Sequence, residues 1–411
     1  MSWIWLRVLL ASLTLMLTIE APVPVEEPVR TAQEEAALVE RMEATQDIRE
    51  CISLGAELEL DMIDLDRFDV TAEEMDALYY EMLGTRELPW YMELNWSYIQ
   101  ARDETVRYLK PAYLDPAKYQ RSRYEQAAQE ALAEAVLPGM SELQIALSLH
   151  EYLSTHCAYD DTLTRFTEYD VLVRGSAVCQ GYSEAYMDLL GRAGIESIIV
   201  TSEQMNHCWN QVKLDGQWYN VDLTWNDPSP NLEGMVGHSF FLISDERIGS
   251  EEYGYYGWSS PNACTDTTYE TEQFWTGSTS PVVYADADTC YLIRMEEKGY
   301  RILSRKESTG EERSLGWMDF KYPEAFATGR RRLLVYVSGL SKVGDGLYYT
   351  DVNGLRRLDL ATGEVTTVYE HDISESRQVL VGSFLEGGTL YLTTMDKKQE
   401  FYSTQIPFDA E

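Results

Sequence analysis

The chain has few basic residues and few cysteines, and their scarcity excludes several classes of function. It has 33 basic side chains against 69 acidic ones, which gives a net charge of −36. So acidic a surface repels phosphate backbones and argues against a nucleic-acid partner. It has six cysteines in 411 residues and no C-x-x-C pair. This excludes a disulfide scaffold, a zinc ribbon and a C-x-x-C redox motif, and leaves open one or two disulfides if the protein is exported.

Long apolar runs are absent after the N-terminus. There, Arg7 precedes an apolar run over residues 8–19, whose length suits a signal peptide and is short for a bilayer span. Residues 3–6 extend the run, so an uncleaved anchor is one alternative, and a buried helix of a cytosolic protein is another. We expect residues 1–21 to be a signal peptide or anchor of an exported, extracellular or cell-surface protein, with membrane association through this segment only.

Composition and turn signals divide the rest of the chain into three parts. Residues 22–117 combine an acidic, proline-rich linker with a region of helices and strands, in which residues 90–109 favour a strand pair. Residues 118–280 are the predicted core. Residues 281–411 are predicted to be β-rich.

Three helices are expected around the core, over residues 117–137, 141–155 and 179–193. Ser141-Glu142-Leu143-Gln144 is a capping box that opens the second helix. Gly194 is the natural stop of the third helix, because glycine adopts the left-handed conformation that ends many helices.

The C-terminal part is predicted from short strands between turns. Strands over residues 346–350 and 355–360, and a third that begins at Val365, are separated by Asn353-Gly354 and Thr362-Gly363. A similar opening recurs at residues 388–392, a spacing that suits one blade of a β-propeller. The region has room for about three blades, fewer than a closed propeller needs. We therefore expect an all-β meander or a partial propeller-like region.

A hairpin connects His207 to Asp222. Asp215-Gly216 is a strong two-residue turn, and its register predicts Trp209 opposite Asp222 and His207 opposite Thr224. Because side chains alternate along strands, these four would share one face, with Asp222 diagonal to His207 and within reach. A carboxylate there fixes the imidazole tautomer and leaves the other nitrogen free to act as a base.

The same alternation sends Cys208 to the opposite face, so we expect it to be a core residue and not a nucleophile. Cys179 stands at the start of an apolar helix, where the helix dipole lowers a thiol pKa. Its backbone N–H in the first turn is a natural oxyanion donor. Cys179, His207 and Asp222 therefore predict the nucleophile, base and orienting carboxylate of an enzyme that attacks amide bonds.

Three motifs in this order resemble the transglutaminase-like superfamily, in its bacterial exported branch. They are Val178-Cys179-Gln180-Gly181-Tyr182, His207-Cys208-Trp209-Asn210 and residues 218–225, and the resemblance covers about residues 80–260. It implies an α+β fold with a papain-like core, in which the helix that carries the cysteine packs on an antiparallel sheet that carries histidine and aspartate. The position of Cys208 is usually small in that family, often alanine.

The resemblance does not fix the second oxyanion donor, for which Gln180 and Tyr159 are the candidates. We expect Trp209, Trp218 and Trp225 to be mainly core residues. Trp209 is also a candidate to line the substrate site and to shield the pair of His207 and Asp222 from water.

The predicted function is thiol-dependent acyl transfer on peptide or glutamine amides, with no metal ion and no organic cofactor. The partner is a protein or peptide substrate, for which the cell envelope is one source. Hydrolysis by a cysteine peptidase or amidase is favoured, because water is always present. The alternatives are a cross-linking transglutaminase and a non-enzymatic cell-surface binding or assembly module. His150 and His238 are expected to be ordinary structural residues.

Overall fold

The computed structural model describes residues 31–408, apart from 85–86, 94–95, 116–118, 228, 230, 272, 279, 319–338, 387 and 399. The predicted signal or anchor and most of the linker lie outside the described residues. Within the described part, no helix combines the length and apolar character needed to cross a membrane. The chain forms two compact units, one of Met1–Ala72 with Tyr91–Arg123 and the other of Glu73–Trp90 with Tyr124–Glu411.

The first unit combines short helices with a three-stranded sheet. Its strands pair antiparallel in the order β1-β3-β2, which confirms the strand pair predicted over residues 90–109. Thr31 and Glu34 form a capping box at the first helix. The elements are α2 (Ala32–Ala44), α3 (Ile48–Glu57), β1 (Ile63–Asp64), η1 (Asp66–Phe68), β2 (Ser97–Gln100) and β3 (Val106–Lys110).

The second unit begins with helices. Two of the predicted helices hold to within one residue, and the first, predicted from residue 117, begins at Arg121, with 117–118 outside the described residues. The capping box of Ser141 and Gln144 opens α6, and Gly194, with a φ of 84°, follows the end of α8. The elements up to residue 248 are α4 (Ala72–Gly84), α5 (Arg121–Ala135), α6 (Glu142–His156), β4 (Ala158–Tyr159), α7 (Glu168–Leu172), β5 (Ser176–Ala177), α8 (Cys179–Arg192), β6 (Ser197–Ser202), β7 (His207–Leu214), β8 (Gln217–Val221), α9 (Leu223–Asn226), β9 (Phe241–Ile243) and α10 (Asp245–Ile248).

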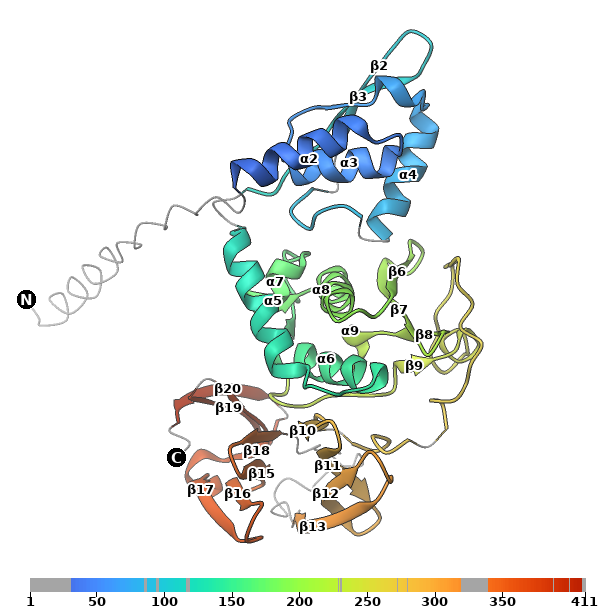
Figure 1. Ribbon diagram of the computed structural model, residues 1–411. Coiled ribbons are helices and arrows are strands. Elements are labelled where there is room, and N and C mark those ends of the chain that lie inside the picture. The colour runs from blue at the N-terminus through green and yellow to red at the C-terminus, as the bar shows by residue number, and fades with distance from the viewer. Residues whose placement is uncertain are drawn as a thin grey trace, which may run out of the picture. The chain divides into compact units, whose positions relative to one another are not determined.

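An antiparallel sheet in the order β6-β7-β8-β9 carries the predicted histidine, and α8 packs against it (Figure 1). Apolar side chains of α5, α6, α8 and the sheet form one buried cluster. Polar contacts fix the helices at this core, because the Tyr186 hydroxyl donates to the Ala146 carbonyl at 2.9 Å. The arrangement places the N-terminus of α8 beside the start of β7.

In its described residues the C-terminal part forms three antiparallel meander sheets, which confirms the β-rich prediction and the repeat within it. Gly346 and the recurring motif near residue 388 each open the second strand of a sheet, β15 and β19. The strands are β10 (Val283–Asp286), β11 (Thr289–Glu296), β12 (Gly299–Lys306), β13 (Glu312–Met318), β14 (Leu340–Val343), β15 (Gly346–Asp351), β16 (Gly354–Asp359), β17 (Val365–Glu370), β18 (Gln378–Glu386), β19 (Thr389–Asp396) and β20 (Phe401–Pro407), with α11 (Ile373–Ser376) before β18.

The helical core and the first meander sheet share buried residues. Val282, Cys290 and Leu292 belong to the same apolar cluster as Leu147 and Leu149 of α6. The predicted boundary at residue 280 therefore falls within one packed unit, and it stays a prediction as a domain limit.

Candidate active site

Cys179 is the first residue of α8, as the sequence predicts. The helix starts close to β5, because a β-carbon at Gly181 would lie 2.7 Å from the Ala177 β-carbon and 2.9 Å from the Thr167 carbonyl oxygen. Only glycine permits this approach. Val178 precedes the helix and offers no side-chain oxygen to its first N–H groups, so the positive end of the helix stays open beside the thiol.

His207 and Asp222 meet directly. The His207 Nε2 lies 2.5 Å from the Asp222 Oδ2, and the Asp222 side chain is 1% exposed. The other carboxylate oxygen, Oδ1, accepts from the backbone N–H of Trp225 at 3.2 Å, so Asp222 is also the N-cap of α9. Because Nε2 faces Asp222, Nδ1 is the ring nitrogen left for the hydrogen bond between His207 and Cys179.

The hairpin register is correct up to Val221, and the prediction beyond it is wrong. Leu214 pairs with Gln217 and Asn210 pairs with Val221. There β8 ends, since Asp222 caps α9 and its backbone N–H donates to the Phe240 carbonyl. Asp222 and Thr224 therefore do not continue the strand opposite Trp209 and His207. The carboxylate reaches the imidazole from a helix cap and not from a strand face.

Cys208 is buried, as predicted, and it also interacts with Cys179, which strand alternation alone does not indicate. Asn210, on the same strand face as Cys208, donates to the Ser183 carbonyl of α8, so this face packs on the helix that carries Cys179 at its first position. Both the thiol and the backbone N–H of Cys208 hydrogen-bond to Cys179. Strand alternation gave the correct face, and the position of α8 on that face could not be read from it.

The electrostatics of the site favour a thiolate beside an imidazolium. The Cys208 hydrogen bond, together with the hydrogen bond and charge of His207, outweighs burial and lowers the pKa of Cys179 to about 4. Burial opposes the charged form of His207, yet hydrogen bonds to Asp222 and Cys179 raise its pKa to about 10. The ion pair is therefore the stable form at neutral pH, which is the state that a nucleophilic cysteine requires.

Alkylation of Cys179 by iodoacetamide is expected to proceed at nearly the same rate at pH 6 and pH 8. A group with a lowered pKa stays ionised above that pKa, so the thiolate is lost only as the pH falls toward about 4. A free cysteine, with a pKa of about 8.5, should gain roughly 80-fold in rate over the same interval. Peptide mapping of the alkylated protein measures the Cys179 alkylation rate at both pH values.

The matched variant is His207→Ala, which should restore a steep pH dependence because it removes the cation beside the thiolate. Cys264, whose pKa burial raises, is an internal reference thiol. A rate at Cys179 that follows free cysteine in the wild type, or is unchanged by His207→Ala, would contradict the ion pair.

Tyr255 is a site residue that the sequence did not indicate. Its hydroxyl donates to the Asp222 Oδ2 at 2.5 Å from a loop 33 residues further along the chain. The ring is 5% exposed and lies edge-on to His207, with centroids 5.9 Å apart. No motif or periodicity surrounds it, so sequence reasoning had no basis to select it. Tyr255 orients the Asp222 carboxylate, and Asp222 in turn orients the His207 imidazole, so Tyr255 is a positioning residue.

Tyr255→Phe is expected to lower kcat for an amide substrate by about tenfold to a hundredfold, since it removes one hydrogen bond to a buried carboxylate. KM should change little, because no substrate contact is lost, and Cys179 alkylation at pH 6 should slow. Tyr253→Phe is the matched control in the same loop, since its hydroxyl contacts Arg247 instead. Equal kcat values for both variants would rule out positioning by Tyr255.

The three substrate or oxyanion candidates differ in their contacts. Tyr159 pairs through its backbone with Ala177, and its phenol is close enough for the charge on Cys179 to contribute to raising its pKa, after burial. The Gln180 amide donates to Glu184 at 2.9 Å within α8. The Trp209 indole N–H donates to Asn220 at 2.9 Å, so it is not an oxyanion donor.

The tryptophans divide differently from the prediction. Trp209 is 1% exposed and its ring stacks on His207 with centroids 6.2 Å apart, a position suited to shielding. Trp225, expected in the core, is 62% exposed and lies edge-on to His207 at 6.5 Å. The helix that begins at Leu223 replaces strand alternation and turns Trp225 outward. Trp225 therefore presents an exposed apolar surface beside His207.

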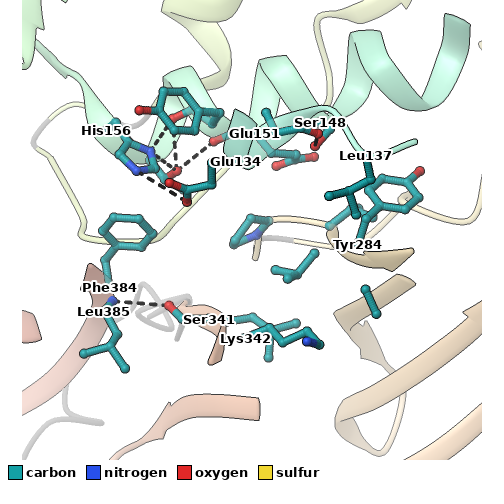
Figure 2. Close-up of a pocket in the computed structure, with 18 residues that line it drawn as sticks. Glu134, Leu137, Ser148, Glu151, His156, Tyr284, Ser341, Lys342, Phe384 and Leu385 are labelled. Atoms are coloured by element: carbon teal, nitrogen blue, oxygen red, sulfur yellow. Dashed lines mark hydrogen bonds and ion pairs between the residues drawn. The ribbon is translucent and has the colours of Figure 1, made fainter. Parts of the chain in front are cut away.

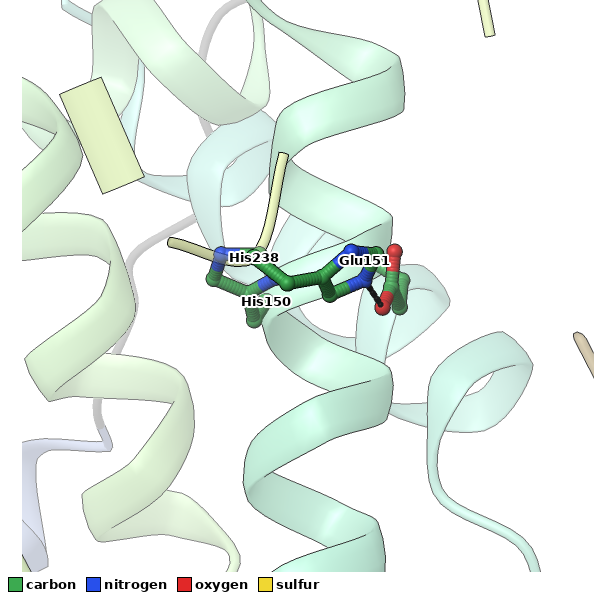
Figure 3. Close-up of side chains that lie close together, drawn as sticks. All are labelled: His150, Glu151 and His238. Atoms are coloured by element: carbon green, nitrogen blue, oxygen red, sulfur yellow. Dashed lines mark hydrogen bonds and ion pairs between the residues drawn. The ribbon is translucent and has the colours of Figure 1, made fainter. Parts of the chain in front are cut away.

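In the part of the chain described, one group of side chains has a geometry that could hold a metal ion. It consists of His150, Glu151 and His238 (Figure 3). The His238 Nε2 lies 2.7 Å from the Glu151 Oε1, and the His150 Nε2 lies 3.0 Å from the Asn226 Nδ2. Burial lowers the pKa of His150, which keeps the imidazole neutral. The contact with Asn226 ties α6 to α9, whose N-cap is Asp222, so the group supports the site as a structural network.

A cavity of about 320 Å³ lies elsewhere, between α5 and α6 and the C-terminal sheets (Figure 2). Its described lining includes Glu134, His156, Ser341 and Phe384, and does not include the three predicted catalytic residues. The His156 Nε2 lies 3.2 Å from Glu386 beside it. The cavity is thus distinct from the site at Cys179.

Comparison with protein families agrees with the motifs. Residues 130–223 match the model of the transglutaminase-like superfamily. The matched segment contains Cys179, His207 and Asp222. No curated protein matches the chain.

Solved structures with local similarity include two with related descriptions. One is a candidate cysteine protease from Cytophaga hutchinsonii, with 13% identity and a TM-score of 0.22 over 34% of this chain and 65% of that one. The other is described as a TGase, with 15% identity and a TM-score of 0.23 over 39% of this chain and 50% of that one. The chain thus spans less than two thirds of either protein, and TM-scores this low carry no structural argument.

Proposed function

Since residues 130–223 are a transglutaminase-like domain, we propose that this chain is a thiol enzyme that transfers acyl groups from peptide or glutamine amides. One observation carries the proposal. The Cys179 thiol at a helix N-terminus hydrogen-bonds to His207, whose Nε2 lies 2.5 Å from Asp222. Nucleophile, base and orienting group thus stand in one line of contacts, as covalent catalysis by a thiol requires.

The first half of the reaction forms a thioester. The Cys179 thiolate attacks the amide carbonyl carbon, and the oxyanion that develops lies at the N-terminal end of α8, near the Cys179 N–H. His207 then donates its Nδ1 proton to the departing nitrogen, which leaves as an amine or ammonia. Asp222 holds the imidazole in orientation through Nε2 and stabilises its charged form.

The second half depends on the acceptor. His207, now neutral, takes a proton from the attacking group, the thioester carbon–sulfur bond breaks, and the Cys179 thiolate returns. Water as acceptor gives a peptidase or amidase, and a lysine amine gives a cross-link. We favour hydrolysis, because water reaches any half-exposed thiol and needs no binding site of its own.

Two other functions compete with hydrolysis. A cross-linking transglutaminase uses the same first half and differs only in the acceptor. A non-enzymatic binding or assembly module would use the C-terminal sheets as its contact surface and leave the thiol idle. The charged pair at Cys179 and His207 favours the enzymatic functions, because a structural thiol gains nothing from ionisation.

The test is a peptide library incubated with the full chain, with and without a primary amine, and read by mass spectrometry. Cleavage, deamidation and amine incorporation give different product masses. Hydrolysis predicts cleaved or deamidated peptides that are absent with Cys179→Ala. Dominant amine incorporation would favour cross-linking, and no product that depends on Cys179 would favour the binding module.

We also propose that the protein acts after export, on protein or peptide substrates such as those of the cell envelope. The apolar run over residues 8–19 supports export. N-terminal sequencing of the protein purified from its native source, together with fractionation of that source, tests it. Recovery from the cytosol with residues 1–21 intact would contradict export.

A further inference from the structure

Two thiols meet at the candidate site, although they come from different elements. Asn210 of β7 donates from its side chain to the Ser183 carbonyl of α8 at 2.9 Å. Cys208 lies two residues earlier on the same strand face, and Cys179 lies one helical turn earlier on α8. The strand therefore runs along the helix so that Cys208 faces Cys179 as Asn210 faces Ser183.

The Cys208 and Cys179 side chains also affect each other's ionisation. The Cys208 thiol and its backbone N–H both hydrogen-bond to the sulfur of Cys179. Cys208 also hydrogen-bonds to Ser183, which holds its side chain between the two helix positions. Both cysteines are free thiols. A disulfide between them requires a sulfur–sulfur distance of about 2.05 Å.

The two sulfurs differ in exposure and charge, in the way that stepwise oxidation requires. Cys179 is half-buried, so a small oxidant can reach it, and its thiolate is the form that peroxides attack. Cys208 is 8% exposed, and its hydrogen bond to Cys179 and burial raise its pKa, so it stays a neutral thiol. One cysteine is therefore poised to react first and the other to resolve the product.

We propose that Cys179 and Cys208 form a peroxide-reactive modification site, in which a reversible disulfide between them masks Cys179. Formation of this disulfide does not depend on the proposed function. Its consequence, loss of amide turnover, does rest on that function.

The chemistry balances with hydrogen peroxide as oxidant. The Cys179 thiolate attacks one peroxide oxygen, the O–O bond breaks, and the hydroxide that leaves takes the proton of the His207 imidazolium and becomes water, which gives a sulfenic acid at Cys179. The Cys208 sulfur then attacks the Cys179 sulfur, the S–O bond breaks, and the hydroxide takes up the proton of Cys208 as water. Two thiols and one peroxide give one disulfide and two waters. A dithiol reductant reverses the step and is itself oxidised to a disulfide.

The experiment treats the folded full chain with hydrogen peroxide and maps its peptides without reduction. We expect a crosslinked pair of the peptides that carry Cys179 and Cys208, and loss of Cys179 alkylation that dithiothreitol restores. In Cys208→Ala no crosslink can form, so Cys179 should advance to sulfinic acid, and dithiothreitol should not restore its alkylation. Cys264→Ala, which alters a thiol beside Asp245, is the matched control and should behave as wild type.

Wild-type protein that gives irreversible Cys179 oxidation as fast as Cys208→Ala, or that pairs Cys179 with another cysteine, would overturn the proposal. The wild-type peptide map decides this even if Cys208→Ala fails to fold. A crosslink in a protein without amide turnover would retain the modification site and reject the proposed function. Amide turnover without a crosslink would retain the proposed function and reject the modification site.

Discussion

Cys179→Ala is expected to abolish amide turnover, with a loss in kcat/KM of roughly a millionfold if the residue acts as the nucleophile. The thioester of the proposed mechanism forms on the Cys179 sulfur, which alanine lacks. Cys208, the thiol beside it, is buried and held neutral, so it cannot substitute. Substrate binding should persist, because alanine removes only the sulfur. Turnover of a peptide from the library, with thermal unfolding to check the fold, measures the effect.

Cys264→Ser provides the control for loss of a thiol as such. Cys264 is 1% exposed and lies beside Asp245, so its replacement should affect stability and not turnover. Retention of more than a small fraction of wild-type turnover in Cys179→Ala would show that the thiol is not the nucleophile. Equal losses in both variants would point to a general effect on folding.

Asp222→Asn is expected to lower kcat by about 10⁴-fold with little change in fold. Both carboxylate oxygens are in use: Oδ2 accepts from the His207 ring and the Tyr255 hydroxyl, and Oδ1 accepts from the Trp225 N–H. Asparagine supplies one acceptor only. If its oxygen keeps the cap of α9, its NH₂ faces His207, and the imidazole must place its proton on Nδ1, which cannot then act as the base.

Asp215→Asn is the matched control, since it makes the same change in the turn of the same hairpin. Asp215 has a φ of 49°, a conformation that asparagine also tolerates, so turnover and stability should be retained. A loss for Asp222→Asn no larger than that for Asp215→Asn would remove Asp222 from the mechanism. A fall in kcat together with slower Cys179 alkylation at pH 6 would support its role.

Much of the site is predictable because short-range signals position its parts. The Asp215-Gly216 turn sets the register of β7 and β8, and the apolar helix after Cys179 places that residue at a helix start. The C-terminal meanders follow from turn residues and from the repeat that begins at Gly346. In each instance the information lies within a few residues of the feature.

The errors share a different cause. The strand positions predicted for Asp222 and Thr224 are wrong because Asp222 caps a helix instead of continuing the strand. The thiol contact of Cys208 depends on which element covers its strand face, and Tyr255 arrives from a loop without a pattern. Such long-range packing leaves no local trace in a single sequence.

The most direct test of the central claim is to look for the thioester itself. The full chain is mixed with a substrate peptide from the library, quenched in acid within the first turnovers, and mapped by mass spectrometry. The mechanism predicts that the peptide containing Cys179 gains the mass of the substrate acyl group, and that Cys179→Ala gives neither adduct nor product. Steady turnover with no adduct at Cys179, or an adduct on another residue, would contradict it.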